Sequence, residues 1–157
     1  MSNKSLIDEL RLSFSEEAVV EEAGRIGQTT SFAATTPSAV VYPENVAEVQ
    51  RVVRIAAAHG APLYPISRGN NWGYGDACAP QEGSLIVNLS RMNRIIEVNP
   101  ELAYAVVEPG VSQHQLYQHI EDQGLPLWMD VLGSGPDASI IGNIMERGFG
   151  LGPYSDR

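Results

Sequence analysis

Apolar residues in the first part of the chain have the spacing of one helical face. Between residues 5 and 23 these positions are Leu6, Leu10, Phe14 and Val19. The spacing predicts an N-terminal helix over residues 5–23, and no periodic pattern continues through residues 24–37. We therefore expect residues 1–36 to form a helix and an irregular connection ahead of the main domain.

Two short apolar runs flank a second helical segment. The first run covers residues 39–42 and the second covers residues 63–66. Between them a helix is expected to begin near Glu44, whose charge suits a helix N-terminus, and to end at Gly60. The predicted buried face of this helix consists of Val46, Val49, Val53 and Ala57. A strand, a helix and a strand in this order predict a βαβ unit, with parallel strands and a right-handed crossover.

The second half of the chain carries short strands separated by turn residues. The expected strands cover residues 85–89, 95–98 and 104–108. Asn99-Pro100 and Pro109-Gly110 are typical turn sequences, and this spacing favours antiparallel pairing of the strands.

A capped helix follows these strands. Ser112 and Gln115 match a capping box, and Gly124 is expected to end the helix. Its buried stripe is expected to contain Leu116 and Ile120.

Further along, Ile140, Ile141 and Ile144 suggest a short helix. Trp128 and Met129, which precede it, are expected in the core.

Composition and charge exclude several functional classes. The net charge is −9 and the sequence has no basic stripe, which argues against nucleic-acid binding. No apolar segment has the length of a membrane span, so we expect a soluble cytoplasmic protein. Cys78 is the single cysteine and is expected to pack within a loop. His114 and His119 lie five residues apart, on different faces of the helix, so no metal site is expected.

A loop rich in glycine and asparagine follows the second apolar run. Residues 65–75 are Pro-Ile-Ser-Arg-Gly-Asn-Asn-Trp-Gly-Tyr-Gly. Glycines permit positive φ angles and close approach to a ligand, and successive backbone N–H groups form an anion-binding nest. The spacing matches neither the dinucleotide fingerprint nor the nucleotide-triphosphate loop. Because the loop follows a parallel strand, backbone groups are expected to hold a pyrophosphate here, with Arg68 projecting outward.

Residues 133–157 form a second glycine-dense region. One hypothesis is a compact surface loop. The other hypothesis is a ligand site, because two glycine-rich loops that each follow a strand suit a large flat ligand with a pyrophosphate tail. Flavin adenine dinucleotide (FAD) is a ligand of that kind.

Several motifs, in order, carry a resemblance to one family. They are Pro-Ile-Ser-x-Gly-x-Asn-x-Gly-Tyr-Gly at 65–75, Met92-Asn93-Arg94-Ile95, Tyr104, Val-Glu-Pro-Gly-Val at 107–111, Gly142-Asn143, Glu-Arg-Gly-x-Gly at 146–150, Pro153-Tyr154 and Asp156. Jointly they resemble the flavoprotein oxidases and dehydrogenases of para-substituted phenols. This is the group of vanillyl-alcohol oxidase, eugenol oxidase and 4-cresol dehydrogenase (p-cresol methylhydroxylase).

The resemblance implies an α+β fold, a PCMH-type FAD-binding domain over residues 37–157. Its two subdomains would be a small parallel βαβ sheet with helices, at about 37–76, and a mainly antiparallel sheet, at about 85–157. The cofactor would lie between them. Family members also have a C-terminal cap domain that covers the flavin and supplies most of the substrate pocket. The present sequence is expected to be a fragment truncated before that domain, and inactive alone.

The resemblance also implies the cofactor contacts. Residues 67–75 would cradle the pyrophosphate and residues 135–150 would run along the flavin. The expected cofactor-binding residues are Ile66, Ser67, Arg68, Gly69, Asn70, Asn71, Gly73, Tyr74, Gly75, Pro109, Gly110, Gly135, Ser139, Gly142, Asn143, Gly148 and Gly150. The histidines that attach flavin covalently in some relatives have no counterpart here, so non-covalent FAD is expected.

The chemistry that the resemblance implies is hydride transfer from the benzylic carbon of a phenolate to flavin N5. Tyr74 matches the phenolate-binding tyrosine, and Asp156 matches an acidic residue near N5 that is proposed to act as a base. The alternatives are that Tyr74 only packs and that Asp156 is solvated. Residues 154–157 are Tyr-Ser-Asp-Arg where several relatives have Tyr-Gly-Asp-His, which leaves the geometry of the acid open.

Two other functions stay open at this point. The first is an oxidase or dehydrogenase of the same superfamily that acts on a 2-hydroxy acid or a lactone. The second is a non-catalytic flavin-binding module. The expected partners are FAD and a small phenolic substrate, together with a second copy in a homodimer or a cytochrome subunit.

Overall fold

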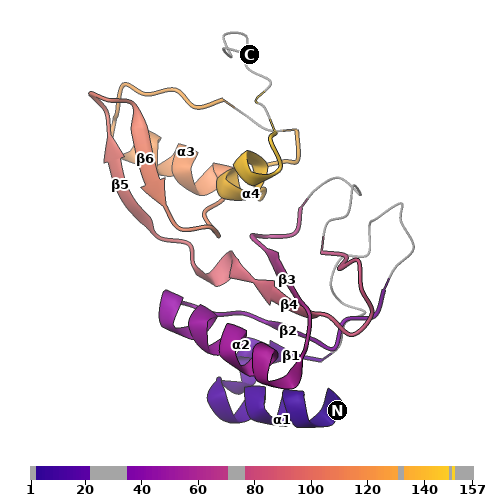
Figure 1. Cartoon of the computed structure of the whole chain (residues 1–157). Coiled ribbons are helices and arrows are strands. Elements are labelled where there is room, and N and C mark those ends of the chain that lie inside the picture. Colours follow the sequence, from indigo (N-terminus) through magenta and orange to yellow (C-terminus); the bar gives the residue numbers. More distant parts are fainter. Residues whose placement is uncertain (1–2, 22–34, 71–76, 131–132, 149, 151–157) are drawn as a thin grey trace.

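Two sheets, each with helices packed on it, make up the fold (Figure 1). The computed structural model describes residues 3–21, 35–70, 77–130, 133–148 and 150. In chain order the elements are α1 (Asn3–Ser13), η1 (Glu16–Ala18), β1 (Val19–Val20), β2 (Ala39–Val41), α2 (Val46–His59), β3 (Leu63–Ile66), β4 (Leu85–Asn88), η3 (Leu89–Arg91), β5 (Ile95–Asn99), β6 (Tyr104–Val107), α3 (Gln113–Asp122) and α4 (Ile140–Met145). The expected α+β class, with a parallel part and an antiparallel part, is confirmed.

Within the described residues the first sheet has four strands in the order β1-β2-β4-β3. Strands β2 and β3 are both parallel to β4, so the predicted parallel orientation is confirmed. The prediction that residues 85–89 begin the antiparallel sheet is wrong, because β4 lies between β2 and β3. The physical reason is burial, since all four residues of β4 are buried, which is typical of a central parallel strand.

The N-terminal helix is shorter than predicted. It ends at Ser13, and Val19 belongs to β1, where it pairs with Val41 of β2. Two consecutive β-branched residues at the start of β1 favour an extended backbone over a helix. Leu6 and Leu10 of α1 are buried as expected.

Helix α2 buries a different face from the predicted one. Its N-cap is Asn45, whose side chain accepts a hydrogen bond from the Glu48 N–H. Its buried residues are Val52, Ile55 and Ala56, whereas Val46, Val53 and Ala57 are exposed. The predicted stripe and the observed one lie side by side on this helix. The stripe with Ile55 is the one buried, because Ile55 removes a larger apolar side chain from water than any residue of the predicted stripe.

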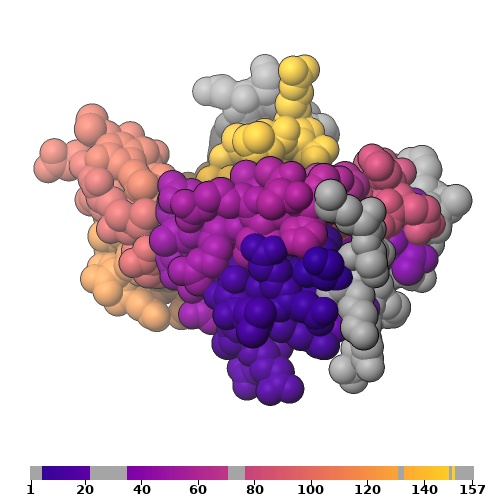
Figure 2. Space-filling view, turned by 60° about the horizontal axis from the view of Figure 1, so that its bottom comes forward, coloured from indigo at the N-terminus to yellow at the C-terminus, as the bar shows by residue number. Residues whose placement is uncertain are grey.

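The core of the first sheet lies on both of its faces. Helices α1 and α2 cover one face, where a buried cluster contains Leu6, Leu10, Val19, Ala39, Val41, Val52, Ile55, Ala56, Leu85 and Val87. The other face holds Val40, Ile66, Ala77, Ala79 and Ile86. Figure 2 shows α1 lying over α2 on the first of these faces, with the region of β5, β6 and α3 to one side.

The second sheet is the antiparallel pair β5-β6, as predicted. Helix α3 packs on it through Leu116 and Ile120, together with Val111 just before the helix, and both hydrogen bonds of the predicted capping box are present. Trp128 is 64% exposed, so its predicted core position is wrong. The chain after α3 places alternate residues inward, and Met129 contacts the core while Trp128 points away from it.

None of the helices in the described part of the chain is long and apolar enough to cross a membrane.

Candidate functional site

A cavity of about 640 Å³ opens at the carboxyl end of β3. Its walls come from β3 and the loop after it, from the start of η3, from the segment between β6 and α3, from the segment between α3 and α4, and from α4 and its C-cap. The residues that line it are Tyr64, Pro65, Ile66, Ser67, Arg68, Gly69, Asn70, Leu89, Pro109, Ser134, Ala138, Ser139, Ile141, Gly142, Asn143, Met145 and Glu146. The lining residues thus come both from the first sheet and from the region of the second, and Figure 1 shows how these elements are arranged.

The loop after β3 has a backbone that requires glycine at one position. Gly69 has φ +79°, and a Cβ atom there would lie 3.3 Å from both Ala77 Cβ and Ile66 Cδ1. Any side chain at this residue would be strained by its φ angle and crowded by its neighbours. The positive φ that the sequence predicts for glycines of the 65–75 loop is confirmed at Gly69.

Arg68 does not project outward, contrary to the expectation. Its Nε donates to the carbonyl oxygen of Asp137 (2.7 Å) and its Nη1 donates to the carbonyl oxygen of Gly110 (3.2 Å). Its Nη2 also lies 3.9 Å from the carboxylate of Asp137. The side chain turns inward because these carbonyl oxygens come within reach of its planar fork of donors.

Ser139 organises the start of α4. Its hydroxyl accepts a hydrogen bond from the Gly142 N–H (3.0 Å) and donates one to the carbonyl oxygen of Pro109 (2.7 Å). Gly142 in turn packs on Ser67, since a Cβ atom at Gly142 would lie 3.3 Å from Ser67 Oγ. Helix α4 is thereby held against the loop that follows β3.

Of the residues expected to bind cofactor, nine line the cavity. They are Ile66, Ser67, Arg68, Gly69, Asn70, Pro109, Ser139, Gly142 and Asn143. Asn71, Gly73, Tyr74, Gly75 and Asp156 lie outside the described residues. The expected roles of those five residues stay predictions.

Four further glycines of the expected set are described but do not line the cavity: Gly110, Gly135, Gly148 and Gly150. Gly110 packs on η3 and the residue after it, and a Cβ atom there would lie 2.8 Å from Ser90 O and 2.7 Å from Met92 O. Its lack of a side chain therefore serves contact between protein backbones.

Sequence reasoning missed several lining residues, notably Tyr64, Ser134, Met145 and Glu146. Strand alternation was a usable signal for Tyr64, because it shares a face of β3 with Ile66. Met145 lies one helical turn after Ile141, so the spacing in α4 was a signal for it. Glu146 opens the Glu-Arg-Gly-x-Gly motif at 146–150 but was not assigned a cofactor contact, and no local pattern marks Ser134.

One buried acidic residue fixes the chain beside the cavity. Glu108 is 7% exposed, and its carboxylate accepts hydrogen bonds from the backbone N–H (2.8 Å), Nε (3.0 Å) and Nη2 (2.7 Å) of Arg94. The side-chain hydrogen bond from Arg94, followed by the backbone one, lowers the pKa of Glu108 despite its burial. Because Glu108 precedes Pro109 and Gly110, this pairing holds one wall of the cavity in position.

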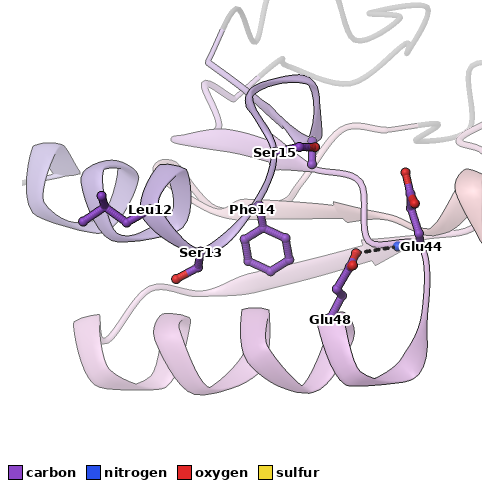
Figure 3. A pocket seen from close by; sticks show the side chains of 7 residues that line it. Leu12, Ser13, Phe14, Ser15, Glu44 and Glu48 are labelled. Carbon is purple, nitrogen blue, oxygen red and sulfur yellow. Dashed lines mark hydrogen bonds between the residues drawn. The ribbon is translucent and has the colours of Figure 1, made fainter.

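A second cavity, of about 330 Å³, lies between the end of α1 and the start of α2 (Figure 3). Phe14 borders it, and the carboxylate of Glu48 accepts a hydrogen bond from the Glu44 N–H (2.8 Å). This carboxylate satisfies a free N–H at the start of α2, so its contacts are those of a helix cap. In the described ranges no three His, Cys, Asp or Glu side chains gather into a group that suits a metal ion.

The comparisons with known proteins agree on one family. A family model described as FAD binding domain matches residues 37–155. The chain is 46% identical over 138 residues to 1'-carboxy-chondrochloren decarboxylase of Chondromyces crocatus, covering 87% of this chain and 26% of that protein. It is 43% identical over 124 residues to the 4-cresol dehydrogenase (hydroxylating) flavoprotein subunit of Pseudomonas putida, covering 79% of this chain and 24% of that protein.

A more distant relative and a solved structure extend this result. The chain is 34% identical over 155 residues to a D-2-hydroxyglutarate dehydrogenase of Stutzerimonas stutzeri, covering 96% of this chain and 33% of that protein. The structure of 4-ethylphenol oxidase from Gulosibacter chungangensis, in complex with isoeugenol, superposes with a TM-score of 0.87 at 36% identity, covering 98% of this chain and 30% of that one. The chain spans about a quarter to a third of the length of these relatives.

Proposed function

The chain belongs to the FAD binding domain family, and from this premise we propose that its cavity at the end of β3 is the FAD site of an oxidoreductase of para-substituted phenols. The observation that carries the proposal is the chemistry of the cavity lining. One side offers backbone groups of a positive-φ turn at Gly69 and the polar side chains of Ser67 and Asn70. Helix α4 contributes the apolar side chains of Ile141 and Met145 to the lining.

This lining fits a cofactor that has a charged diphosphate and a flat ring system. Backbone N–H groups hold a diphosphate without the help of a lysine side chain. No lysine lines the cavity among the described residues. We assign the diphosphate to residues 67–70 and to the continuation of that loop at Asn71, Gly73 and Gly75. The ring system is assigned to α4, beside Gly142 and Asn143.

FAD, when bound, accepts a hydride from the benzylic carbon of the substrate. In the proposal the hydroxyl of Tyr74 donates a hydrogen bond to the phenolate oxygen and so favours the ionised phenol. The carboxylate of Asp156 accepts or relays a proton as the substrate is oxidised. Non-covalent attachment of FAD is also part of the proposal for this domain.

Two similarities support a phenol as the substrate. One relative at 43% identity is named for 4-cresol, and the superposed structure is that of a 4-ethylphenol oxidase. The first of these is named a flavoprotein subunit, so a second, electron-accepting subunit such as a cytochrome is the partner that we propose. Since this chain spans about a quarter of that relative, the 157-residue chain is expected to bind FAD without turnover.

The test uses a longer protein that contains this domain and compares phenols with analogues that cannot ionise. We expect anaerobic reduction of its flavin by 4-cresol, 4-ethylphenol, eugenol or vanillyl alcohol. The matched control substrates are the corresponding phenyl methyl ethers, which cannot ionise. Equal reduction by a phenol and its ether contradicts the proposed role of the phenolate.

Two variants of the longer protein test the assigned residues. Asp156→Asn should slow flavin reduction by about 10²-fold, as is typical for loss of a general base. Tyr74→Phe should lower the rate most where the phenol is least ionised, since it removes a hydrogen-bond donor to the phenolate. Asp122→Asn and Tyr117→Phe on the surface of α3 are the matched controls. A rate for Asp156→Asn within about threefold of the parent contradicts the assigned role of a general base.

A second candidate function is oxidation of a 2-hydroxy acid. The observation that favours it is the identity of 34% over 155 residues to a D-2-hydroxyglutarate dehydrogenase. Flavin reduction by D-2-hydroxyglutarate or D-lactate, with none by the phenols, selects this function. A flavin that no substrate of either class reduces selects a non-catalytic FAD-binding module.

The relative at 46% identity is named a decarboxylase, so the substrate panel includes a para-hydroxyphenyl compound with a carboxyl group beside the benzylic carbon. Release of carbon dioxide from this compound is measured alongside flavin reduction.

A further inference from the structure

Arg68 connects the loop after β3 with two distant segments whose adjacent residues, Pro109 and Ala138, line the cavity. The residue follows the end of β3 by two positions, whereas its acceptors lie 42 residues away at Gly110 and 69 residues away at Asp137. We call its contacts with Gly110 and Asp137 the Arg68 bridge. The side chain is 25% exposed, and Arg68 also lines the cavity.

Both acceptors of the Arg68 bridge are fixed by other contacts. The N–H of Gly110 donates to the carbonyl oxygen of Met92 (2.8 Å), which ties this residue to the end of η3. Asp137 lies in a turn closed by a hydrogen bond from the Ala138 N–H to the Gly135 carbonyl oxygen (3.1 Å). This turn leads directly into α4. The Arg68 bridge therefore sets where the turn and α4 lie relative to the loop after β3.

The bridge depends on the shape of a guanidinium group. Nε and Nη1 donate in different directions to two carbonyl oxygens, and Nη2 lies beside a carboxylate. A lysine carries the same charge on a single nitrogen and cannot reproduce this fork. Two N–H donors of Arg68 already bind protein carbonyl oxygens, so the side chain has a structural role that requires no contact with a phosphate.

We propose that the side chain of Arg68 is a positioning group: its guanidinium fixes the separation of the two cavity walls before the cofactor binds and does not contact the cofactor phosphates. The proposal rests on the proposed function only in naming FAD as the ligand. Without the bridge, the molecule samples several separations of the walls, and only one of them fits FAD. The apparent affinity for FAD is then reduced in proportion to the fraction of molecules that have this separation.

The experiment compares Arg68→Lys and Arg68→Gln in the 157-residue chain. Arg51→Lys and Arg51→Gln are the matched controls, because Arg51 Nη1 also donates to a backbone carbonyl oxygen, that of Ser13 (2.8 Å), on the far side of the first sheet. Calorimetric titration with FAD is done at several salt concentrations, and hydrogen exchange of the apo chain is followed by mass spectrometry. Thermal unfolding is recorded for every variant.

We expect both Arg68 variants to weaken FAD binding alike, by about tenfold, as when one molecule in ten has the competent separation. The dependence of the dissociation constant on salt should match that of the parent chain. Amides of residues 133–139 should exchange faster in both Arg68 variants, and both Arg51 variants should leave FAD affinity and this exchange unchanged.

Three results overturn the proposal. Near-parental affinity in Arg68→Lys, with weak and less salt-dependent binding in Arg68→Gln, means that Arg68 contacts a phosphate by charge. A lowered unfolding midpoint with unchanged affinity means that the bridge only stabilises the fold. Unchanged exchange of residues 133–139 means that the bridge does not hold the wall. If the parent chain binds no FAD, the proposed function fails for this chain, while exchange in the apo chain still decides the role of the bridge.

Discussion

Replacement of Gly110 by alanine should destabilise the fold strongly, because the added methyl group has no space to occupy. A Cβ atom at this position would lie 2.8 Å from the carbonyl oxygen of Ser90 and 2.7 Å from that of Met92. These neighbours are backbone atoms of η3 and its C-cap, so they cannot rotate away as the end of a side chain would. The added methyl group therefore has to push two segments of backbone apart.

The expected magnitude has two parts. Overpacking of a close contact typically costs about 1–3 kcal/mol. Separation of the segments also weakens the hydrogen bond from the Gly110 N–H to Met92, which contributes about 1 kcal/mol. We expect a total loss of about 3 kcal/mol in the free energy of unfolding. For a chain of this size that loss corresponds to a fall in Tm of roughly 6–12 °C.

The assay is equilibrium unfolding in urea, together with a thermal melt, for Gly110→Ala and for Gly124→Ala. Gly124 has φ +59° and no atom within 4 Å of an added Cβ, so it isolates the cost of a positive φ. That cost is about 1 kcal/mol. If Gly110→Ala costs no more than Gly124→Ala, the backbone around η3 yields to the methyl group and the crowding argument is refuted.

Three further substitutions test other features of the structure. Glu108→Gln should lower the free energy of unfolding at pH 7, because Arg94 holds the pKa of Glu108 below its ordinary value of 4.5. The difference in unfolding free energy between variant and parent should shrink as the pH falls below 4.5, and a difference that does not change with pH contradicts this. Arg147→Gly should stabilise the chain by about 1 kcal/mol in urea titrations, because Arg147 has φ 56° at the end of α4, and a loss of stability there indicates that its side chain makes a necessary contact. Gly69→Val should weaken FAD binding at least tenfold in calorimetric titrations, because its φ of +79° and its two close neighbours exclude a branched side chain; an affinity equal to that of the parent contradicts the assigned cradle.

Local signals in the sequence predicted several elements correctly. The capping box of Ser112 and Gln115 predicted the start of α3, and turn residues predicted the antiparallel pair β5-β6. Both signals act over a few residues, and the contacts that they predict are equally local. The positive φ of Gly69 was predictable for the same reason, since a tight turn after a strand requires it.

Features that depend on distant contacts were not predicted. Strand β4 joined the first sheet because β2 and β3 pair with its two edges and the clusters on either side of the sheet bury both of its faces. Its unbroken apolar run was a usable signal for that position. The buried face of α2 was decided by the sheet and α1, which no pattern within the helix specifies. The inward turn of Arg68 depends on acceptors 42 and 69 residues away, beyond the reach of any local motif.

The central place of β4 also fixes the order in which the first sheet can form during synthesis. Strands β2 and β3 emerge from the ribosome first, yet each has β4 as its parallel partner and they do not pair with one another. Translation adds about 5–20 residues per second, so β3 waits roughly 1–4 s before residue 88 is added. During that interval the edges of β2 and β3 that will pair with β4 present unpaired backbone groups, which favour association with other chains. A nascent chain that has residues 39–66 outside the ribosome and residues 85–88 still inside it should therefore bind chaperones more strongly than a chain in which residues 85–88 have also emerged.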